Sequence, residues 1–282
     1  MRVAFLHSDK PREGLLADAF LEGARKHGHT TAAIALGDDS FAGKFDVVCM
    51  VGVKSRELFQ AHVRAGSMII YLDKGYCRHR SSVGRTWEYW RVAVNAHQPT
   101  RFLDRPFPGD RWKSLGIEIA DWRSSGKQIV LAGSSAKYHE FYDLKDPTAW
   151  MRGVVRDLLD LTQRPLVYRP KPSWRDAVPI TKTRFSSRDE AIGDALNNAW
   201  ALVTHGSNAC FEAVIAGIPC IVLGDAVAKP LSSTNLADVE APHLASRKQR
   251  LRWAEALAYH QFTAAEFAAG LAWDVIKDEI HA

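Results

Sequence analysis

One continuous segment, WALVTHGSNACFEAVIAGIPCIVLGD from Trp200 to Asp225, constrains the fold of this 282-residue chain more than any other feature. It begins with an apolar run of strand length, which is followed by the small polar turn Thr204–Asn208. Helical spacing then extends over Ala209–Ala216 and stops at Gly217, and the apolar run after it predicts a second strand. A strand, turn, helix and strand in this order form the repeating unit of a parallel Rossmann-like sheet.

The rest of the chain alternates strand and helix patterns in the same way. In the first half the expected strands are Val3–His7, Thr30–Leu36, Phe45–Gly52 and Ser67–Asp73. A second alternation starts near Asp121. We therefore predict an α/β protein with two Rossmann-like domains, 1–122 and 123–282, that face each other across a cleft. The stretch 74–113 is expected to be an irregular insertion because prolines interrupt it, and the last helix has the option of packing back on the first domain.

The composition is typical of a soluble globular protein. Hydrophobic residues make up 46% and charged residues 24% of the chain, and no apolar run reaches the roughly 18 residues that span a bilayer. The N-terminal MRVAFLHSDK has too short an apolar run for a signal peptide. None of the four cysteines belongs to a CxxC pair, which argues against a zinc site and favours a reducing compartment. We expect a cytoplasmic protein, of a bacterium or of a phage-infected host, with no metal and no cofactor.

Positive charge is concentrated in the stretch Lys74–Lys113. This stretch holds nine Lys or Arg against three acidic residues, whereas the whole chain has a net charge of +5. Tryptophan and tyrosine side chains are interleaved with the charges. A basic and aromatic surface suits a polyanion such as nucleic acid, or a phosphorylated carrier, and a solvated loop with ordinary aromatic packing is the alternative. The residues expected to contact the acceptor are Lys74, Arg78, Arg80, Arg85, Trp87, Trp90 and Arg91.

The turn at Thr204–Asn208 has the features of an anion site. The unpaired N–H groups of a helix start face such a turn, and Gly206 would let a phosphate approach the backbone. Ser207 or Asn208 is expected to cap the helix. Glu212 lies about one turn into the helix, within reach of a ribose hydroxyl. A well-capped structural helix is the alternative explanation.

The pattern H-G-S-N-A-x-x-E-A-x-x-x-G-x-P, from His205 to Pro219, resembles the donor-binding segment of GT-B glycosyltransferases. The similarity is greatest to capsular-polysaccharide transferases, teichoic-acid glycerophosphotransferases and UDP-GlcNAc 2-epimerases, and it extends over about Ile129–Asp225. The resemblance implies that Glu212 holds the ribose of the donor. The residues that it assigns to the turn around the donor's phosphates are His205, Gly206, Ser207 and Asn208.

Two further segments at expected strand ends supply donor-binding candidates. Arg169 and Lys171 alternate with prolines that stiffen their loop, so that a guanidinium fork and an ammonium can grip phosphate. The related transferases have a K/R-P-H-P run at this place, and Lys171 stands where their histidine would be. The other candidates are Gly133, Ser134 and Ser135, in a small-residue loop after a strand, and Ser186, in a turn.

An inverting sugar transfer needs a base that accepts the proton of the acceptor hydroxyl. Asp9 and Asp73 follow the first and fourth expected strands, and ligands of parallel sheets bind beyond such carboxyl ends. Each is also a common type of turn former or helix cap. The chain has no D-x-D motif, so we expect a metal-independent transfer in which Arg169, Lys171 and the helix start stabilise the departing phosphates.

Together these residues predict a compact GT-B glycosyltransferase that moves a sugar from a nucleotide sugar to an acceptor hydroxyl. The acceptor suggested by the basic stretch is a modified base in phage DNA, because small transferases that decorate such bases also resemble the GT-B type. A surface polysaccharide is its main competitor. Two other classes of function stay open: a sugar-nucleotide 2-epimerase, and a non-catalytic nucleic-acid-binding protein that has kept a degenerate transferase fold.

Overall fold

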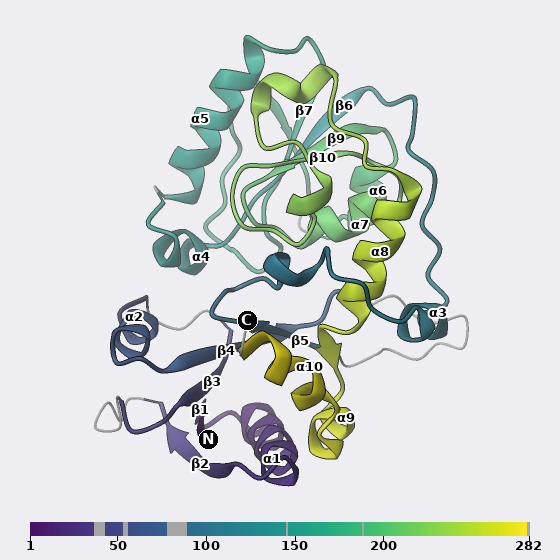
Figure 1. Cartoon of the computed structure of the whole chain (residues 1–282). Coiled ribbons are helices and arrows are strands. Elements are labelled where there is room, and N and C mark those ends of the chain that lie inside the picture. The colour runs from purple at the N-terminus through teal and green to yellow at the C-terminus, as the bar shows by residue number, and fades with distance from the viewer. Residues whose placement is uncertain (37–42, 53–55, 78–88, 145, 188, 281–282) are drawn as a thin grey trace. The chain divides into compact units, whose positions relative to one another are not determined.

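The computed structural model describes residues 1–36, 43–52, 56–77, 89–144, 146–187 and 189–280 (Figure 1). The chain divides into two compact units. The first consists of Met1–Gly116 together with Ala254–Ala282, and the second of Ile117–Trp253. Each unit is built around its own sheet, and the predicted α/β class with two Rossmann-like sheets is confirmed. The predicted boundary at residue 122 and the cleft between the domains stay predictions.

The sheet of the first unit has the strand order β11-β5-β4-β3-β1-β2. Its strands are β1 (Arg2–His7), β2 (Thr30–Ala35), β3 (Val47–Val51), β4 (Met68–Lys74), β5 (Trp90–Val94) and β11 (Gln261–Phe262). The four predicted strands are present as β1 to β4 and are parallel, whereas β5 pairs antiparallel with β4, and β11 antiparallel with β5. The expectation that 74–113 is irregular throughout is wrong, because Trp90–Val94 is a fully buried strand.

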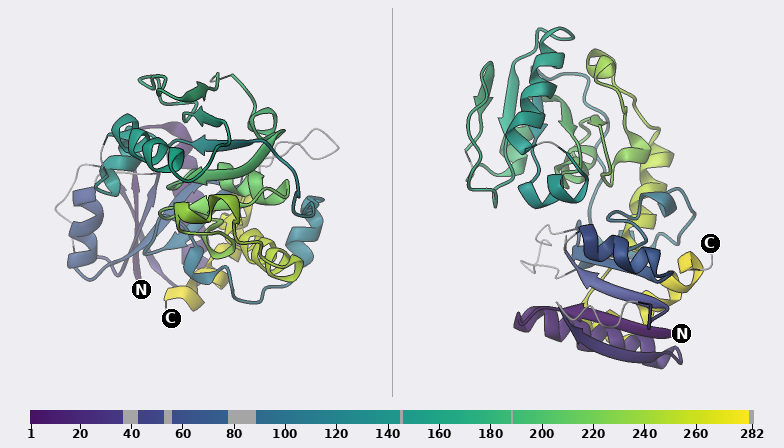
Figure 2. Two further views of the ribbon diagram at one scale, coloured as in Figure 1. Left: turned by 90° about the horizontal axis from the view of Figure 1, so that it is seen from above. Right: turned by 90° about the vertical axis from the view of Figure 1, so that its left-hand side faces the viewer.

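Helices from both ends of the chain cover one face of this sheet. The helices of the unit are α1 (Pro11–Lys26), α2 (Arg56–Arg64), α3 (Asp110–Leu115), α9 (Ala264–Ala269) and α10 (Leu271–Ile280), with a 3-10 turn, η2 (Thr100–Phe102). The C-terminal α9 and α10 lie beside the N-terminal α1 (Figures 1 and 2). The last helix expected from the sequence is divided into α9 and α10 because Gly270 takes a left-handed conformation with φ 91°.

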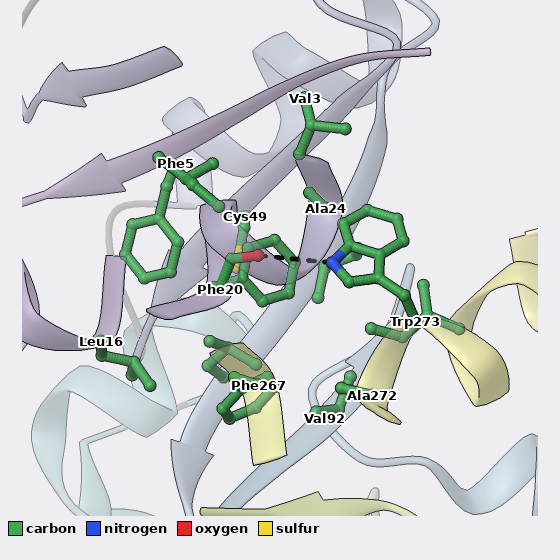
Figure 3. Packing of buried hydrophobic residues seen from close by; sticks show 14 of the residues in the cluster. Val3, Phe5, Leu16, Phe20, Ala24, Cys49, Val92, Phe267, Ala272 and Trp273 are labelled. Carbon is green, nitrogen blue, oxygen red and sulfur yellow. Dashed lines mark hydrogen bonds between the residues drawn. The ribbon is translucent and has the colours of Figure 1, made fainter. Parts of the chain in front are cut away.

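Aromatic side chains join these helices to the sheet. The ring of Phe20, on α1, packs against Phe5, Phe267 and Trp273 with centroid distances of 5.7, 5.8 and 5.2 Å (Figure 3). The indole nitrogen of Trp273 donates to the backbone oxygen of Phe20 at 3.4 Å. All four side chains are fully buried, so the last two helices complete the core of the first unit.

The sheet of the second unit is parallel throughout, with the order β10-β9-β6-β7-β8. Its strands are β6 (Gln128–Ala132), β7 (Leu166–Arg169), β8 (Thr183–Phe185), β9 (Ala199–Thr204) and β10 (Cys220–Val222). The chain adds β7 and β8 on one side of β6 and then returns to place β9 and β10 on the other side. The strand order therefore reverses between β6 and β9, where α/β sheets bind ligands beyond the carboxyl ends of their strands.

Helix α5 packs on one face of this sheet, and α6 and α7 lie together on the other (Figure 1). The helices of the unit are α4 (Ala136–Phe141), α5 (Pro147–Leu159), α6 (Ile192–Leu196) and α7 (Ala209–Ile215), with 3-10 turns η3 (Lys229–Leu231) and η4 (Leu236–Glu240). Helix α8 (Arg247–Ala258) leads from the second unit into the first. Among the described residues, the helices are all too short or too polar to cross a membrane.

Candidate functional site

The predicted turn after β9 lies at the point where the strand order of the second sheet reverses. Ala132, the last residue of β6, is in register with Thr204 on β9 and with Arg169 on β7. The hydroxyl of Thr204 donates to the backbone oxygen of Ala132 at 2.9 Å and accepts from the backbone N–H of Ser207 at 3.0 Å. One buried hydroxyl thus ties the turn to the end of β6. The ends of β7, β6 and β9 lie side by side at one edge of the sheet.

The start of α7 is capped by the serine of the turn. The hydroxyl oxygen of Ser207 accepts from the backbone N–H of Ala209 at 3.3 Å. Asn208 occupies the N-cap position but makes no capping hydrogen bond through its side chain. Of the two caps considered from the sequence, Ser207 is therefore the one that satisfies a free N–H at the helix start.

A neighbouring side chain leaves no room for a Cβ atom at Gly206. A Cβ atom at this position would lie 1.7 Å from the hydroxyl oxygen of Tyr138 and 2.8 Å from the backbone oxygen of Asp225. Tyr138 is on α4 and is buried. The tyrosine fills the space on the Cβ side of Gly206, and the approach of a phosphate to its backbone stays a prediction.

His205 lies in an aromatic cluster that the sequence did not reveal. Its Nδ1 atom is 3.0 Å from the hydroxyl of Tyr138, and its ring packs against Tyr138, Tyr142 and Trp150 with centroid distances of 5.6 to 5.7 Å. The hydroxyl of Tyr142 donates to a carboxylate oxygen of Asp225 at 3.0 Å. Tyr138 and Tyr142 are four residues apart on or next to α4, a spacing that places both on one helical face and was the available sequence signal.

Burial lowers the pKa of His205 to about 4, with smaller contributions from the charges of His139 and Lys229. The imidazole is therefore neutral at pH 7. Neutral imidazole carries one N–H and one lone pair, so it binds by hydrogen bonding and ring contact, without the charge that would grip a phosphate.

We expect this pKa shift to make wild-type stability fall as the pH is lowered from 6.5 to about 4, since the unfolded state takes up the proton first. In a His205→Phe variant this part of the acid sensitivity should disappear. The difference should reach about 1 to 2 kcal/mol once the solvent near the half-buried ring is allowed for. Thermal unfolding between pH 4 and 7 measures it, with exposed His243→Phe as control. Parallel profiles for wild type and His205→Phe would contradict the assignment.

Arg169 and Glu212 are close enough for their charges to interact. Burial lowers the pKa of the Arg169 guanidinium, and the charges of Glu190 and Glu212 oppose this effect. One nitrogen of Arg169 donates to the backbone oxygen of Glu190 at 3.0 Å. Ser186, a predicted donor-binding residue, is fully buried and donates to the carboxylate of Glu190. Glu190 was missed from the sequence, and it fixes the position of Arg169.

The remaining donor candidates differ in how accessible they are. Lys171 is exposed in the loop after β7. The backbone N–H of Gly133 donates to the backbone oxygen of Arg169 at 2.9 Å, and a Cβ at Gly133 would meet the ring of Tyr168 at 3.2 Å. Ser134 is buried, and Ser135 is the partly exposed N-cap of α4. These small residues follow β6 directly, next to the Thr204 turn.

In the first unit, the two candidate bases have different surroundings. Asp9 is exposed. The Asp73 carboxylate, at the end of β4, lies 3.1 Å from a guanidinium nitrogen of Arg91 and 3.9 Å from Nε2 of His97, and its side chain is 34% exposed. Arg91 also donates to Gln98 at 3.2 Å. Asp73 is thus held in place by a polar network while it stays accessible to solvent.

Trp90 and Arg91, two residues of the predicted basic and aromatic acceptor surface, are buried. Arg91 is 1% exposed and Trp90 is 7% exposed, because both belong to β5 inside the sheet. The guanidinium of Arg12 lies 4.7 Å from the centre of the Trp90 ring. Lys74 is exposed. The candidates Arg78, Arg80, Arg85 and Trp87 lie outside the described residues.

Comparison with known proteins shows similarity in structure. No protein-family model matches the chain, and no curated protein matches it. The β-Kdo 2,7 transferase of KpsC from Thermosulfurimonas dismutans is similar with a TM-score of 0.58 at 15% identity, over 98% of this chain and 100% of that one. The β-Kdo 2,4 transferase of KpsC from the same organism gives 0.53 at 12% identity, over 93% and 91%. The chain has a GT-B glycosyltransferase-like fold, as the sequence resemblance implied.

Proposed function

We propose that this protein is a glycosyltransferase that moves a sugar from a nucleotide-activated donor to an acceptor hydroxyl. The observation that carries the proposal is the placement of Arg169 and Glu212 beside the reversal point of the second sheet, with their charges interacting. A cation and a carboxylate at such an edge match two parts of a nucleotide, its phosphate and its ribose. The fold shared with two sugar transferases supports the same class of reaction.

Each residue of the donor site has a defined task in this proposal. The guanidinium of Arg169 binds phosphate oxygens and stabilises the negative charge that develops on the leaving group. Glu212 accepts a hydrogen bond from a ribose hydroxyl. Lys171 adds a positive charge from the loop after β7, and Gly133 lets the donor approach the backbone after β6. Transfer through these residues needs no metal, which stays a prediction.

Asp73 is the better candidate for the base. Its carboxylate is held in place by Arg91 at 3.1 Å, and with 34% exposure it is still accessible to an acceptor. Asp9 is exposed and forms no ion pair among the described residues. Asp73 would accept the proton of the acceptor hydroxyl as that oxygen attacks the sugar.

A saccharide hydroxyl is the acceptor that we propose. The DNA acceptor considered from the sequence relied on an exposed basic and aromatic surface, and Trp90 and Arg91 are buried. The two similar structures are Kdo transferases by name, which agrees with transfer of a sugar. A sugar-nucleotide 2-epimerase would convert its substrate without any acceptor, so product analysis separates these functions.

Replacing Glu212 with glutamine is expected to weaken nucleotide-sugar binding about tenfold to a hundredfold, the loss typical for a hydrogen bond to a charged group. A thermal-shift screen against a panel of nucleotide sugars identifies the donor, since a ligand of the native state raises the unfolding temperature. Calorimetry with that donor then measures the affinity. Exposed Glu118→Gln in the same unit is the matched control. Equal affinities of wild type and Glu212→Gln would refute the ribose assignment.

A further inference from the structure

The second unit contains a cavity that Arg169 and Glu212 do not line. It has a volume of about 540 Å³ and lies between α5 and the segment after β10. Trp150, Gly153 and Asp157 line it from α5, His205 from the turn, and Leu223 and Leu236 from the opposite side. This volume is in the range of small-molecule sites, about 300 to 1,000 Å³.

From the lining of this cavity we infer that the α5 side of the second unit is a second binding site, which takes a neutral sugar ring such as a hexose unit of a glycan. Arg169 and Glu212 do not line this cavity, and α7, which carries Glu212, lies on the other face of the sheet. The cavity shares His205 with the predicted donor turn.

One of the residues that line the cavity is a glycine in the middle of a helix. Gly153 is in the interior of the 13-residue α5, where glycine costs about 0.5 to 1 kcal/mol relative to alanine. A Cβ atom added to it would meet no heavy atom within 4 Å. Packing therefore does not require a glycine here, and any larger side chain would extend into the cavity.

The lining chemistry suits a neutral polyol with an apolar face. His205 is neutral at pH 7, and its ring meets Trp150 edge to face with a centroid distance of 5.6 Å. Leucine side chains complete an apolar wall, against which the C–H face of a sugar ring can pack. Asp143 and Asp157 place carboxylates at the same cavity, as acceptors for sugar hydroxyls. Among the described residues that line it, none is a lysine or arginine, so an anion finds no counter-charge in this lining.

The test is a binding measurement without any nucleotide donor. Saturation-transfer NMR and calorimetry are run with methyl β-glucoside and methyl β-galactoside as probes, and with choline and inorganic phosphate as cationic and anionic comparisons. Gly153→Phe fills the cavity and should abolish glycoside binding, while nucleotide-sugar binding is unchanged. Gly193→Phe is the matched control, because a Cβ there also meets no heavy atom within 4 Å and Gly193 is exposed on α6.

The outcomes are distinct. Glycoside binding by wild type and Gly193→Phe, with none in a folded Gly153→Phe protein, supports the site. If Gly153→Phe does not fold, Asp157→Ala replaces it, since the half-exposed Asp157 side chain can be removed without opening the core, and at least a fivefold loss of affinity is then expected, or about 1 kcal/mol. Absence of glycoside binding to wild type, binding that survives the cavity variant, or binding of choline or phosphate alone would overturn the proposal. Failure of sugar transfer leaves these readouts unaffected.

Discussion

Replacing Arg169 with methionine is expected to lower the turnover of sugar transfer about 100- to 1000-fold, the loss typical when one preorganised donor to developing charge is removed. The guanidinium is fixed before the substrate arrives, because it donates to the backbone oxygen of Glu190, whose carboxylate is held by Ser186. Charge on the leaving phosphate increases in the transition state, so kcat should fall more than donor affinity. Steady-state kinetics with the identified nucleotide sugar measures both.

Two further variants make this result specific to the charge at Arg169. Arg169→Lys keeps a cation but loses the planar fork, so its turnover should lie between those of wild type and Arg169→Met. Arg156→Met removes an arginine whose side chain is 78% exposed and is paired with its neighbour Asp157. This change should leave turnover unchanged. If Arg169→Met folds normally and turns over as wild type does, leaving-group stabilisation by this residue is refuted.

The segment from β9 to β10 was predictable from the sequence because its signals are local. The strand before Thr204, the polar turn and the helix from Ala209 follow one another within the chain, and hydrophobic periodicity reports each of them. The reason for Gly206 was not predictable, since Tyr138 reaches it from a helix 68 positions earlier in the sequence. A sequence pattern indicates that a turn needs a glycine. The residue that fills the space beside this glycine is seen only in the three-dimensional structure.

The first sheet shows why charged residues mislead such predictions. Trp90–Val94 reads WRVAV, an ordinary strand pattern apart from its arginine. Arginine is almost never fully buried unless it is paired, so Arg91 was assigned to an exposed basic surface. Its partners, Asp73, His97 and Gln98, come from another strand and from a later loop. Burial of this charge is a long-range property, and no local pattern contains it.

Replacing Arg91 with methionine is expected to destabilise the first unit by about 2 to 3 kcal/mol, less than the loss typical when one partner of a fully buried ion pair is removed, because the Asp73 side chain is 34% exposed. The change leaves Asp73 without its guanidinium neighbour, and it removes the hydrogen bonds to His97 at 2.8 Å and Gln98 at 3.2 Å. Urea unfolding followed by circular dichroism measures the loss. Because the chain has two units, we expect the transition of the first unit to shift while that of the second is retained.

The matched controls separate this structural role of Arg91 from the acceptor role assigned to it by its position in the basic stretch. Lys113→Met removes an exposed cation from the same stretch and should change stability by less than about 0.5 kcal/mol. The double variant Arg91→Met with Asp73→Asn no longer leaves an uncompensated carboxylate, so part of the lost stability should return. If Arg91→Met is as stable as wild type but binds a polyanion more weakly at low salt, the arginine belongs to a binding surface after all. The burial of Arg91 at 1% exposure favours the first result, since a side chain with no access to solvent acts on a ligand only through Asp73.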